Sequence, residues 1–159
     1  MSEKDIKIVT LPPMRVICFN GFGRMPEDQA YTKASTWLKA NGMWGDWKSH
    51  KFFGYNNPDP SPGSPNYGYD VWITVDDSVQ PGGEGRIIDF QGGLFAVAHV
   101  HAGPEGQGIH EKWQELAAWV ENSRYTPEFH NRQWLEESPN PFEGSPEGFD
   151  LKLYAPVRD

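Results

Sequence analysis

The sequence predicts an α+β fold in which two tandem βαββ units form an antiparallel sheet with two main helices on one face. Two observations carry this prediction. A Pro/Gly-rich motif of the form P-x-P-x-x-G-S-P occurs at 58–65 and again at 139–146. The strand-like segments 69–75 and 149–155 also align, at an offset of 80 (149 − 69). We interpret the repeat as a duplication that fills the whole chain. Its period is too long and its copies are too few for a solenoid.

Both halves place their elements in the same order: apolar strand, glycine-containing turn, amphipathic segment, strand, Pro-rich loop and strand. Half-unit 1 is expected to cover about 5–76 and half-unit 2 about 86–158, with a polar Gly-rich linker between them. If a pseudo-two-fold axis relates the halves, equivalent strands meet near that axis. A ligand cleft between the pseudo-symmetric halves is therefore expected.

In the first half, the run 14–19 predicts a strand and Gly21–Gly23 a turn. Pro26 suits the first position of a helix, because proline has no donor to lose there, and Asn41–Gly42 suits the end. A short strand is expected at 52–56. The segment 69–75 alternates apolar and polar residues, which predicts a half-exposed strand with a helix on its apolar face. The apolar-face residues are Tyr69, Val71, Ile73 and Val75, and the other face holds Asp70, Trp72 and Thr74.

In the second half, strands are predicted at 86–90 and 94–101, and a helix at about 107–121, where an apolar stripe recurs at helical spacing. Strands at 132–137 and 149–157 complete the unit.

The amino-acid composition limits which classes of partner and which cell compartment are expected. Fourteen basic and 22 acidic residues give a net charge of −8, which argues against direct nucleic-acid binding, since phosphate neutralisation needs clustered Lys and Arg. The single cysteine, Cys18, lies in an apolar run and cannot form an internal disulfide, as in a reducing cytoplasm. No apolar run is long enough for a membrane span, and the first residues lack a signal peptide. A cytoplasmic protein with no membrane association and no cofactor is expected.

Several segments resemble the GyrI-like small-molecule-binding domain, which is also the effector-binding domain fused to AraC- and MerR-type regulators. The resemblance covers nearly the whole chain. It rests on FGYNNPDP at 53–60, YDVWITV at 69–75, QGGLFAV at 91–97, HAGP at 101–104, WLE at 134–136 and LYAPV at 153–157.

The resemblance implies a duplicated βαββ fold whose cleft takes bulky, often cationic aromatic compounds. Some members of the family inhibit gyrase, and others hydrolyse strained, DNA-alkylating natural products. Because the duplicated unit leaves no room for a helix-turn-helix, the resemblance implies a standalone protein without direct DNA binding. Where the family commonly has a tyrosine shortly after its glutamate, this chain has Glu137 and Ser138.

The candidate site follows from the duplication. At an offset of 81, Phe53 matches Trp134 and Tyr55 matches Glu136 (136 − 55). Aromatic rings and a carboxylate on one cleft suit a flat cation, through stacking, cation–π attraction and a counter-charge. The competing interpretation makes the glutamate a solvated strand residue and Trp72 the cap of a small hydrophobic cluster. The candidate ligand-binding residues are Glu136, Trp134, Tyr55, Phe53, Trp72, Tyr154 and His99.

Three functions are compatible with these residues. The first is a small-molecule binding protein for an aromatic, possibly cationic ligand, in the manner of multidrug-binding proteins. The second is a hydrolase in which burial raises the pKa of Glu136, the general base, while Tyr55 donates to a leaving oxygen. The third is modulation of a protein partner, gyrase or a regulator, which no residue pattern specifically supports. His99 and His101 are spaced for a metal but lack a third ligand, so no metal site is expected.

Overall fold

The computed structural model describes residues 6–57, 59, 61–80, 83–128, 132–142 and 145–159. The chain forms two compact units. We call Met14–Phe90 the α1 unit, and Met1–Pro13 together with Gln91–Asp159 the α2 unit. The elements in order are β1 (Lys7–Leu11), β2 (Met14–Gly23), α1 (Pro26–Ala40), β3 (Phe52–Asn56), β4 (Tyr67–Thr74), β5 (Arg86–Phe90), β6 (Gly93–Ala102), α2 (Ile109–Glu121), β7 (Thr126–Pro127), β8 (Leu135–Ser138) and β9 (Phe149–Arg158).

Each unit contains an antiparallel sheet and one helix, which confirms the predicted α+β class. The strand order is β3-β4-β2-β5 in the α1 unit and β1-β6-β9-β8 in the α2 unit, where β7 also pairs with β9. Each unit therefore holds a βαββ segment from one half of the sequence, β2-α1-β3-β4 or β6-α2-β8-β9. Its remaining long strand comes from the other half, because β5 pairs with β2 and β1 pairs with β6.

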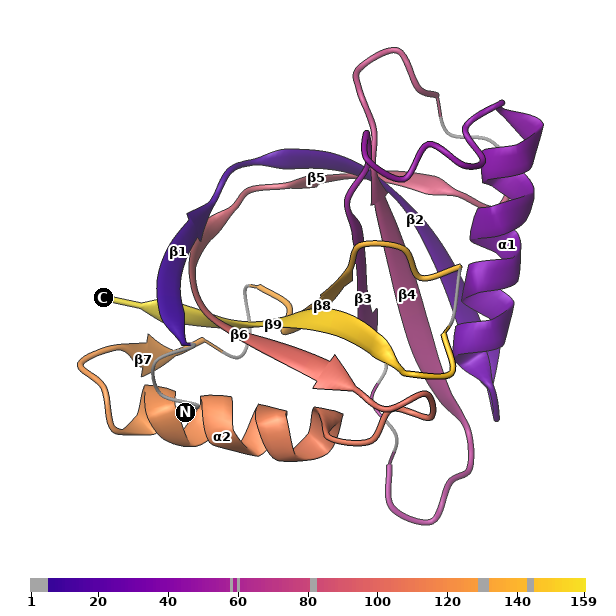
Figure 1. Cartoon of the computed structure of the whole chain (residues 1–159). Coiled ribbons are helices and arrows are strands. Elements are labelled where there is room, and N and C mark those ends of the chain that lie inside the picture. Colours follow the sequence, from indigo (N-terminus) through magenta and orange to yellow (C-terminus); the bar gives the residue numbers. More distant parts are fainter. Residues whose placement is uncertain (1–5, 58, 60, 81–82, 129–131, 143–144) are drawn as a thin grey trace. The chain divides into compact units, whose positions relative to one another are not determined.

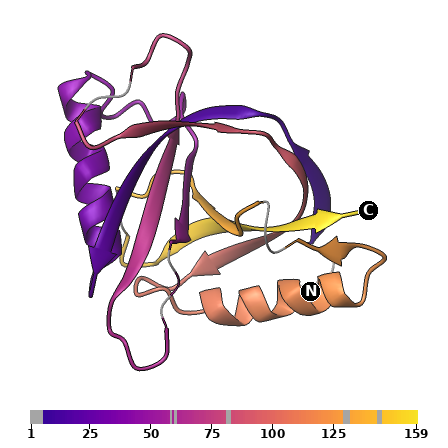
Figure 2. The same ribbon diagram turned by 180° about the vertical axis from the view of Figure 1, so that it is seen from behind.

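Helix α1 covers one face of its sheet, as Figures 1 and 2 show from opposite sides. Pro26 stands at the start of the helix, and two acidic residues in the first turn favour the positive end of its dipole. Asn41 ends the helix, where its side chain donates to the carbonyl of Trp37 at 2.8 Å. The Trp37 ring packs against Phe19 of β2 with ring centroids 6.0 Å apart. The side of this sheet that faces the helix thus carries Phe19 and every second residue of β2 on either side of it.

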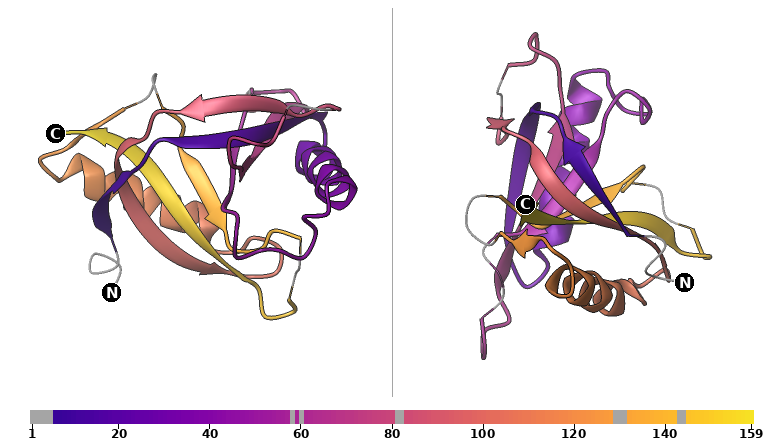
Figure 3. Two further views of the ribbon diagram at one scale, coloured as in Figure 1. Left: turned by 90° about the horizontal axis from the view of Figure 1, so that it is seen from above. Right: turned by 90° about the vertical axis from the view of Figure 1, so that its left-hand side faces the viewer.

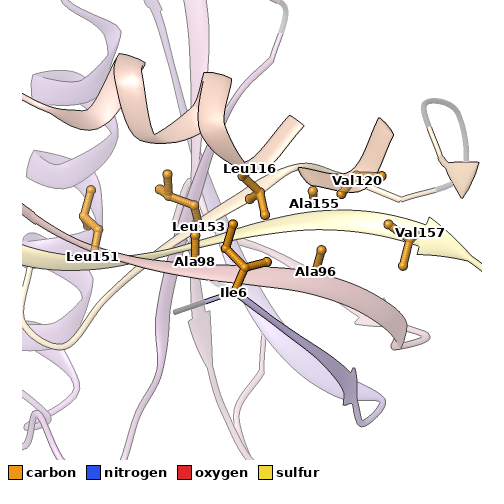
Figure 4. Packing of buried hydrophobic residues seen from close by; sticks show 9 residues of the cluster. All are labelled: Ile6, Ala96, Ala98, Leu116, Val120, Leu151, Leu153, Ala155 and Val157. Atoms are coloured by element: carbon orange, nitrogen blue, oxygen red, sulfur yellow. The ribbon is translucent and has the colours of Figure 1, made fainter. Parts of the chain in front are cut away.

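Helix α2 packs on β6 and β9 of the α2 unit, and is seen nearly end-on in the right-hand view of Figure 3. Leu116 and Val120 project from the helix onto the strands, as Figure 4 shows. Burial of such side chains is worth about 1.5–3 kcal/mol each and fixes which face of the sheet lies under the helix. The residues that share this core are Ile6, Ala96, Ala98, Leu116, Val120, Leu151, Leu153, Ala155 and Val157.

The opposite face of each sheet, which we call its helix-free face, carries the alternate residues of every strand. In the α1 unit the cross-strand partners Asn20–Asp70, Cys18–Trp72 and Phe53–Trp72 lie on this face. Asp70 is 0% and Trp72 1% exposed, so the prediction of a half-exposed strand was wrong and both faces of β4 are buried.

Two further expectations need correction. Gly21–Gly23 is not a turn but the end of β2, where it pairs with β4 from Tyr69 to Tyr67. Strand β8 begins at Leu135 rather than at 132. Parts of the two P-x-P-x-x-G-S-P copies, at 58, 60 and 143–144, lie outside the described residues. Across the described chain, the two helices are too short and too polar to cross a membrane.

Gly54 of β3 allows Tyr69 to pack closely. A Cβ at position 54 would meet the hydroxyl and ring of Tyr69, which is itself buried and lies 6.1 Å from the ring of Tyr31 on α1. Gly54→Ala is therefore expected to displace the Tyr69 ring and to cost about 1–3 kcal/mol in the free energy of unfolding, as for other overpacked cores. Urea unfolding checks this value. In the double variant with Tyr69→Phe, which removes the clashing hydroxyl oxygen, the cost of the alanine should be smaller.

Candidate functional site

A buried carboxylate organises the helix-free face of the α1 unit. Asp70 accepts hydrogen bonds from Asn20 Nδ2 at 2.6 Å, Tyr55 Oη at 2.9 Å and Asn57 Nδ2 at 3.0 Å. Arg86, which is largely exposed, adds an ion pair at 3.5 Å. Residues from β2, β3, β5 and the loop after β3 therefore converge on one side chain of β4. This donor set satisfies and neutralises a charge that would otherwise be costly to bury.

Aromatic residues surround this carboxylate. The half-buried ring of Tyr55 meets Trp72 edge to face, with centroids 5.4 Å apart, and the Phe90 ring lies with its centroid 5.5 Å from that of Trp72. Phe53 pairs across the strands with Trp72. Phe53 and Trp72 are each 1% exposed, so they offer almost no stacking surface, whereas Tyr55 is partly accessible. The structure thus brings three predicted site residues together, with one of them at the surface.

Burial and the nearby carboxylate of Asp70 keep the side chains of Tyr55 and Cys18 protonated. The pKa of Tyr55 is raised, first by burial and then by the charge of Asp70. Burial, followed by Asp70, raises the pKa of the Cys18 thiol to about 12. Tyr55 therefore keeps its proton and directs it to Asp70, and Cys18 stays an unreactive thiol at neutral pH.

The α2 unit has a second tyrosine–carboxylate pair on its own helix-free face. Tyr154 of β9 donates to Glu137 Oε1 of β8 at 2.5 Å. Burial, followed by this hydrogen bond, raises the pKa of Tyr154. Phe95 meets Tyr154 edge to face at 5.9 Å, and the guanidinium of Arg132 lies 5.0 Å above the Phe95 ring. An acid and two rings therefore lie together on one face of this unit.

Glu136 and Trp134 lie on the other side of that sheet. Glu136 pairs across the strands with Leu153, a core residue under α2, and accepts a hydrogen bond from Trp113 Nε1 at 3.3 Å. Trp134 packs on the same core, 6.0 Å from the ring of Trp113, and donates its N–H to a backbone carbonyl. The predicted acid thus contacts the helix side, and not the face that holds Tyr154.

The strand registers show on which face of its sheet each of these residues lies. Tyr55 pairs with Asp70 in β3-β4, and Glu137 pairs with Lys152 in β8-β9. Tyr55 and Glu137 are 82 positions apart (137 − 55), and so are their partners Asp70 and Lys152 (152 − 70). Tyr55 and Glu137 each lie on the helix-free face of their sheet, whereas Glu136 lies on the helix side, so the offset of 81 matches residues on opposite faces. A one-residue slip moves a side chain to the opposite face of a sheet.

Asp70 and Glu137 are the two acidic residues of these clusters that the sequence analysis does not select. Asp70 was assigned to a solvated face, and Glu137 was noted only as a departure from the family pattern. A single acid among the mainly aromatic and apolar residues 69–75 was the available signal for Asp70. Residues 136 and 137 are both acids on one strand and point to opposite faces, so the sequence leaves open which of them faces the site.

Of the two histidines in β6, His99 is exposed on the helix-free face of the α2 unit. His101 is bound through Nδ1 to Asp150 Oδ1 at 2.8 Å and through Nε2 to the carbonyl of Glu147 at 2.7 Å. Within the described residues, no cluster of three or more His, Cys, Asp or Glu side chains is arranged to hold a metal.

The His101 pair predicts a pH dependence of stability. The hydrogen bond to Asp150 and then the carbonyl of Glu147 raise the pKa of His101. Its contribution is therefore fully present below the unfolded value of 6.5 and is lost as the pH rises through the folded pKa. We expect His101→Gln to remove a small part of the thermal stability at about pH 5.5 and little at about pH 8.5. Melting curves of both proteins at the two pH values test this; an equal loss at both would contradict it.

A separate pocket of about 620 Å³ opens beside α1, lined by Lys33, Trp37 and Glu84 among others. Lys33 is paired with Glu84 at 3.3 Å and also donates to the carbonyl of Asn20. The candidate site residues do not line this pocket.

Comparisons with known proteins place the fold. A family model described as the GyrI-like small molecule binding domain matches residues 4–158. No curated protein sequence matches the chain. Among solved structures, the C-terminal domain of EcmrR matches with a TM-score of 0.67 and 12% identity, over 97% of each chain. The EcmrR chain in a complex with DNA matches with a TM-score of 0.70 and 13% identity over 97% of this chain, which spans only 57% of the EcmrR chain.

Two other matches carry functional descriptions of their own. A hydrolase from Listeria innocua matches with a TM-score of 0.67 and 14% identity, over 97% of this chain and 92% of that one. SAV2435, solved bound to tetraphenylphosphonium, matches with a TM-score of 0.56 and 12% identity, over 96% and 93% of the two chains. At these identities the likeness concerns the fold alone.

Proposed function

Because the chain belongs to the GyrI-like small molecule binding domain family, we propose that it binds a bulky aromatic cation on the helix-free face of the α2 unit. The observation that carries this proposal is the Glu137–Tyr154 pair beside Phe95. Glu137 supplies the counter-charge, and Tyr154, which is 4% exposed, holds that carboxylate in place. The relative SAV2435 was solved with tetraphenylphosphonium, an aromatic cation of this kind.

The chemistry of the pair favours a cation over a neutral ligand. Glu137 is half-buried, so its charge is less screened than that of a fully solvated acid. Tyr154 holds the carboxylate in place, which reduces the entropy lost when a ligand binds. A net charge of −8 also favours the approach of cations over a longer range. His99 and Lys152, paired across β6 and β9, lie on the same face.

Glu136 and Glu137 form a matched pair for the test, because adjacent strand residues point to opposite faces. We expect Glu137→Gln to weaken the binding of tetraphenylphosphonium about tenfold, equivalent to about 1.4 kcal/mol. The amide keeps the shape of the side chain and can still accept the Tyr154 hydrogen bond. Glu136→Gln should change the affinity less than twofold. Isothermal titration calorimetry with quenching of tryptophan fluorescence measures both.

The outcomes separate the two candidate acids. A tenfold loss in Glu136→Gln with no loss in Glu137→Gln would restore the assignment made from the sequence. Equal affinities in all three proteins would remove the charge role from both glutamates. If tetraphenylphosphonium does not bind to the wild-type protein, aromatic-cation binding at this face is wrong.

A hydrolase is the second candidate, supported by the Listeria innocua relative described as a hydrolase. Glu137 could accept a proton from an attacking water, and Tyr154 could donate one to a leaving oxygen. Tyr55, the donor expected from the sequence, directs its proton to Asp70 in the α1 unit, as Tyr154 directs its own to Glu137 in the α2 unit. Incubation with a strained electrophile such as styrene oxide, followed by mass spectrometry, tests this candidate. A product that gains one water faster than in buffer and in Glu137→Gln would support catalysis; unchanged compound in the presence of wild-type protein would exclude this substrate.

A further inference from the structure

The pocket beside α1 lies within the α1 unit and combines charged with apolar side chains. Lys33 and Trp37 line it from the helix, Phe19 from β2, and Glu84 from the segment that leads into β5. Its volume of about 620 Å³ is within the range of roughly 300–1,000 Å³ that is usual for small-molecule sites. The α1 unit therefore has room for a ligand at a place that holds both a positive and a negative side chain.

The two charges at this pocket form an ion pair that can accept further partners. Lys33 Nζ lies 3.3 Å from Glu84 Oε1 and donates to the carbonyl of Asn20 at 2.8 Å. An ammonium group has three hydrogens to donate, and a carboxylate has two oxygens that accept. One N–H of Lys33 and the Oε2 atom of Glu84 thus have no partner in the described part of the chain and can bind a ligand.

A ligand that carries both charges suits this ion pair better than an anion or a cation does. A single charge would be attracted by one member of the pair and repelled by the other. A zwitterion can place its carboxylate beside Lys33 and its ammonium group beside Glu84. In an α-amino acid both groups are bonded to one carbon atom, so they are close together, as the charges of the ion pair are at 3.3 Å. The Lys33 side chain is 30% exposed, which leaves its charge less screened than that of a fully solvated lysine.

The rest of the pocket favours a compact apolar group. Trp37 and Ala40 line it with apolar side chains, and Trp37 presents only part of its ring, since it is 8% exposed. The hydroxyl group of Thr36, which also lines the pocket, donates to a backbone carbonyl of α1 at 2.9 Å, so its hydrogen is already engaged. An apolar side chain of the ligand would be removed from water here, which favours binding.

We propose that the pocket beside α1 binds a free α-amino acid with an apolar side chain. Lys33 binds the carboxylate of this ligand, Glu84 binds its ammonium group, and its side chain lies against Trp37 and Ala40. The Lys33–Glu84 pair stays in place, because the ligand uses the hydrogen and the oxygen that the pair leaves over. Glu137 does not line this pocket, and the proposal does not rest on a cation being bound at that residue.

L-Leucine and two analogues that each lack one charge test the proposal. 3-Methylbutylamine is leucine without its carboxylate, and 4-methylpentanoate is leucine without its ammonium group. We expect leucine to bind about tenfold more tightly than either analogue, equivalent to about 1.4 kcal/mol. Isothermal titration calorimetry measures the three affinities. In ¹H–¹⁵N spectra, the shifts that leucine causes should be largest at Lys33, Trp37 and Glu84.

Substitution of either charge should remove the preference that this charge causes. In Glu84→Gln, leucine and 4-methylpentanoate should bind with similar affinity, and in Lys33→Met, leucine and 3-methylbutylamine should do so. Asp28→Asn is the control, because it removes an exposed acid of α1 that does not line the pocket, and it should keep the preference of the wild-type protein. Glu84 is largely exposed, so Glu84→Gln should fold and provides the test even if Lys33→Met does not fold.

Three outcomes would overturn the proposal. They are equal affinity of the wild-type protein for the three compounds, no binding of leucine at millimolar concentrations, and largest spectral shifts at residues that do not line the pocket. The tetraphenylphosphonium titration is a separate measurement, so failure at one site is distinguishable from failure at the other.

Discussion

Asp70→Ala is expected to lower the free energy of unfolding by about 3 kcal/mol, one of the largest effects of a single substitution in this chain. The substitution removes the common acceptor of Asn20, Tyr55 and Asn57 and the partner of Arg86. Arg86 is largely exposed and regains water, so most of the loss comes from the part-buried amide and hydroxyl donors. Urea unfolding followed by tryptophan fluorescence measures the change.

Glu84→Ala is the matched control for Asp70→Ala in the same unit. Glu84 is a well-exposed acid that also pairs with one base, Lys33, and its loss should cost no more than about 0.5 kcal/mol. Similar losses in both variants would mean that the Asp70 network does not stabilise the fold. Asp70→Asn should fall between them, since an amide keeps one acceptor oxygen but loses the charge that pairs with Arg86.

Leu116→Ala is expected to cost about 2–5 kcal/mol in the free energy of unfolding. Leu116 is fully buried between α2 and the strands β6 and β9, as Figure 4 shows. Alanine has a higher helix propensity than leucine, so the loss reports the cavity under the helix and not a weaker helix. Denaturant unfolding monitored by far-UV circular dichroism measures it.

Two substitutions on the same helix delimit this interpretation. Leu116→Met conserves volume and should cost less than about 1.5 kcal/mol. Gln114→Ala, on the exposed side of α2, should change stability by no more than about 0.5 kcal/mol. If Gln114→Ala were as costly as Leu116→Ala, the contact of α2 with its sheet would not be the source of the effect.

Local signals made the elements predictable. Pro26 with two following acids marked the start of α1, and Asn41–Gly42 marked its end, because capping and dipole effects act within a single turn. The strands at 52–56 and 86–90 were placed with their actual bounds. Helix α2 begins at Ile109, two residues later than expected, after Gly108 in a left-handed conformation.

The candidate site was less predictable, since it depends on register and long-range pairing. The alignment offset of 81 matches Tyr55, on the helix-free face, to Glu136, on the helix side, and a change of one residue exchanges Glu136 for Glu137. The burial of Asp70 depends on Asn20, which is 50 positions away in the sequence. The predicted cleft between the two halves stays a prediction.

By itself, the sequence determined the α+β class, the repeated βαββ order and the family, because periodicity, capping residues and short motifs each depend on residues that are close together in the chain. Only the tertiary structure decided which acid shares a face with Tyr154 and that Asp70 is buried. It also decided that the first strand of each sequence half, β1 or β5, joins the sheet of the other unit. Those properties depend on which strands lie side by side and in what register, and strand pairing joins residues that are distant in the chain.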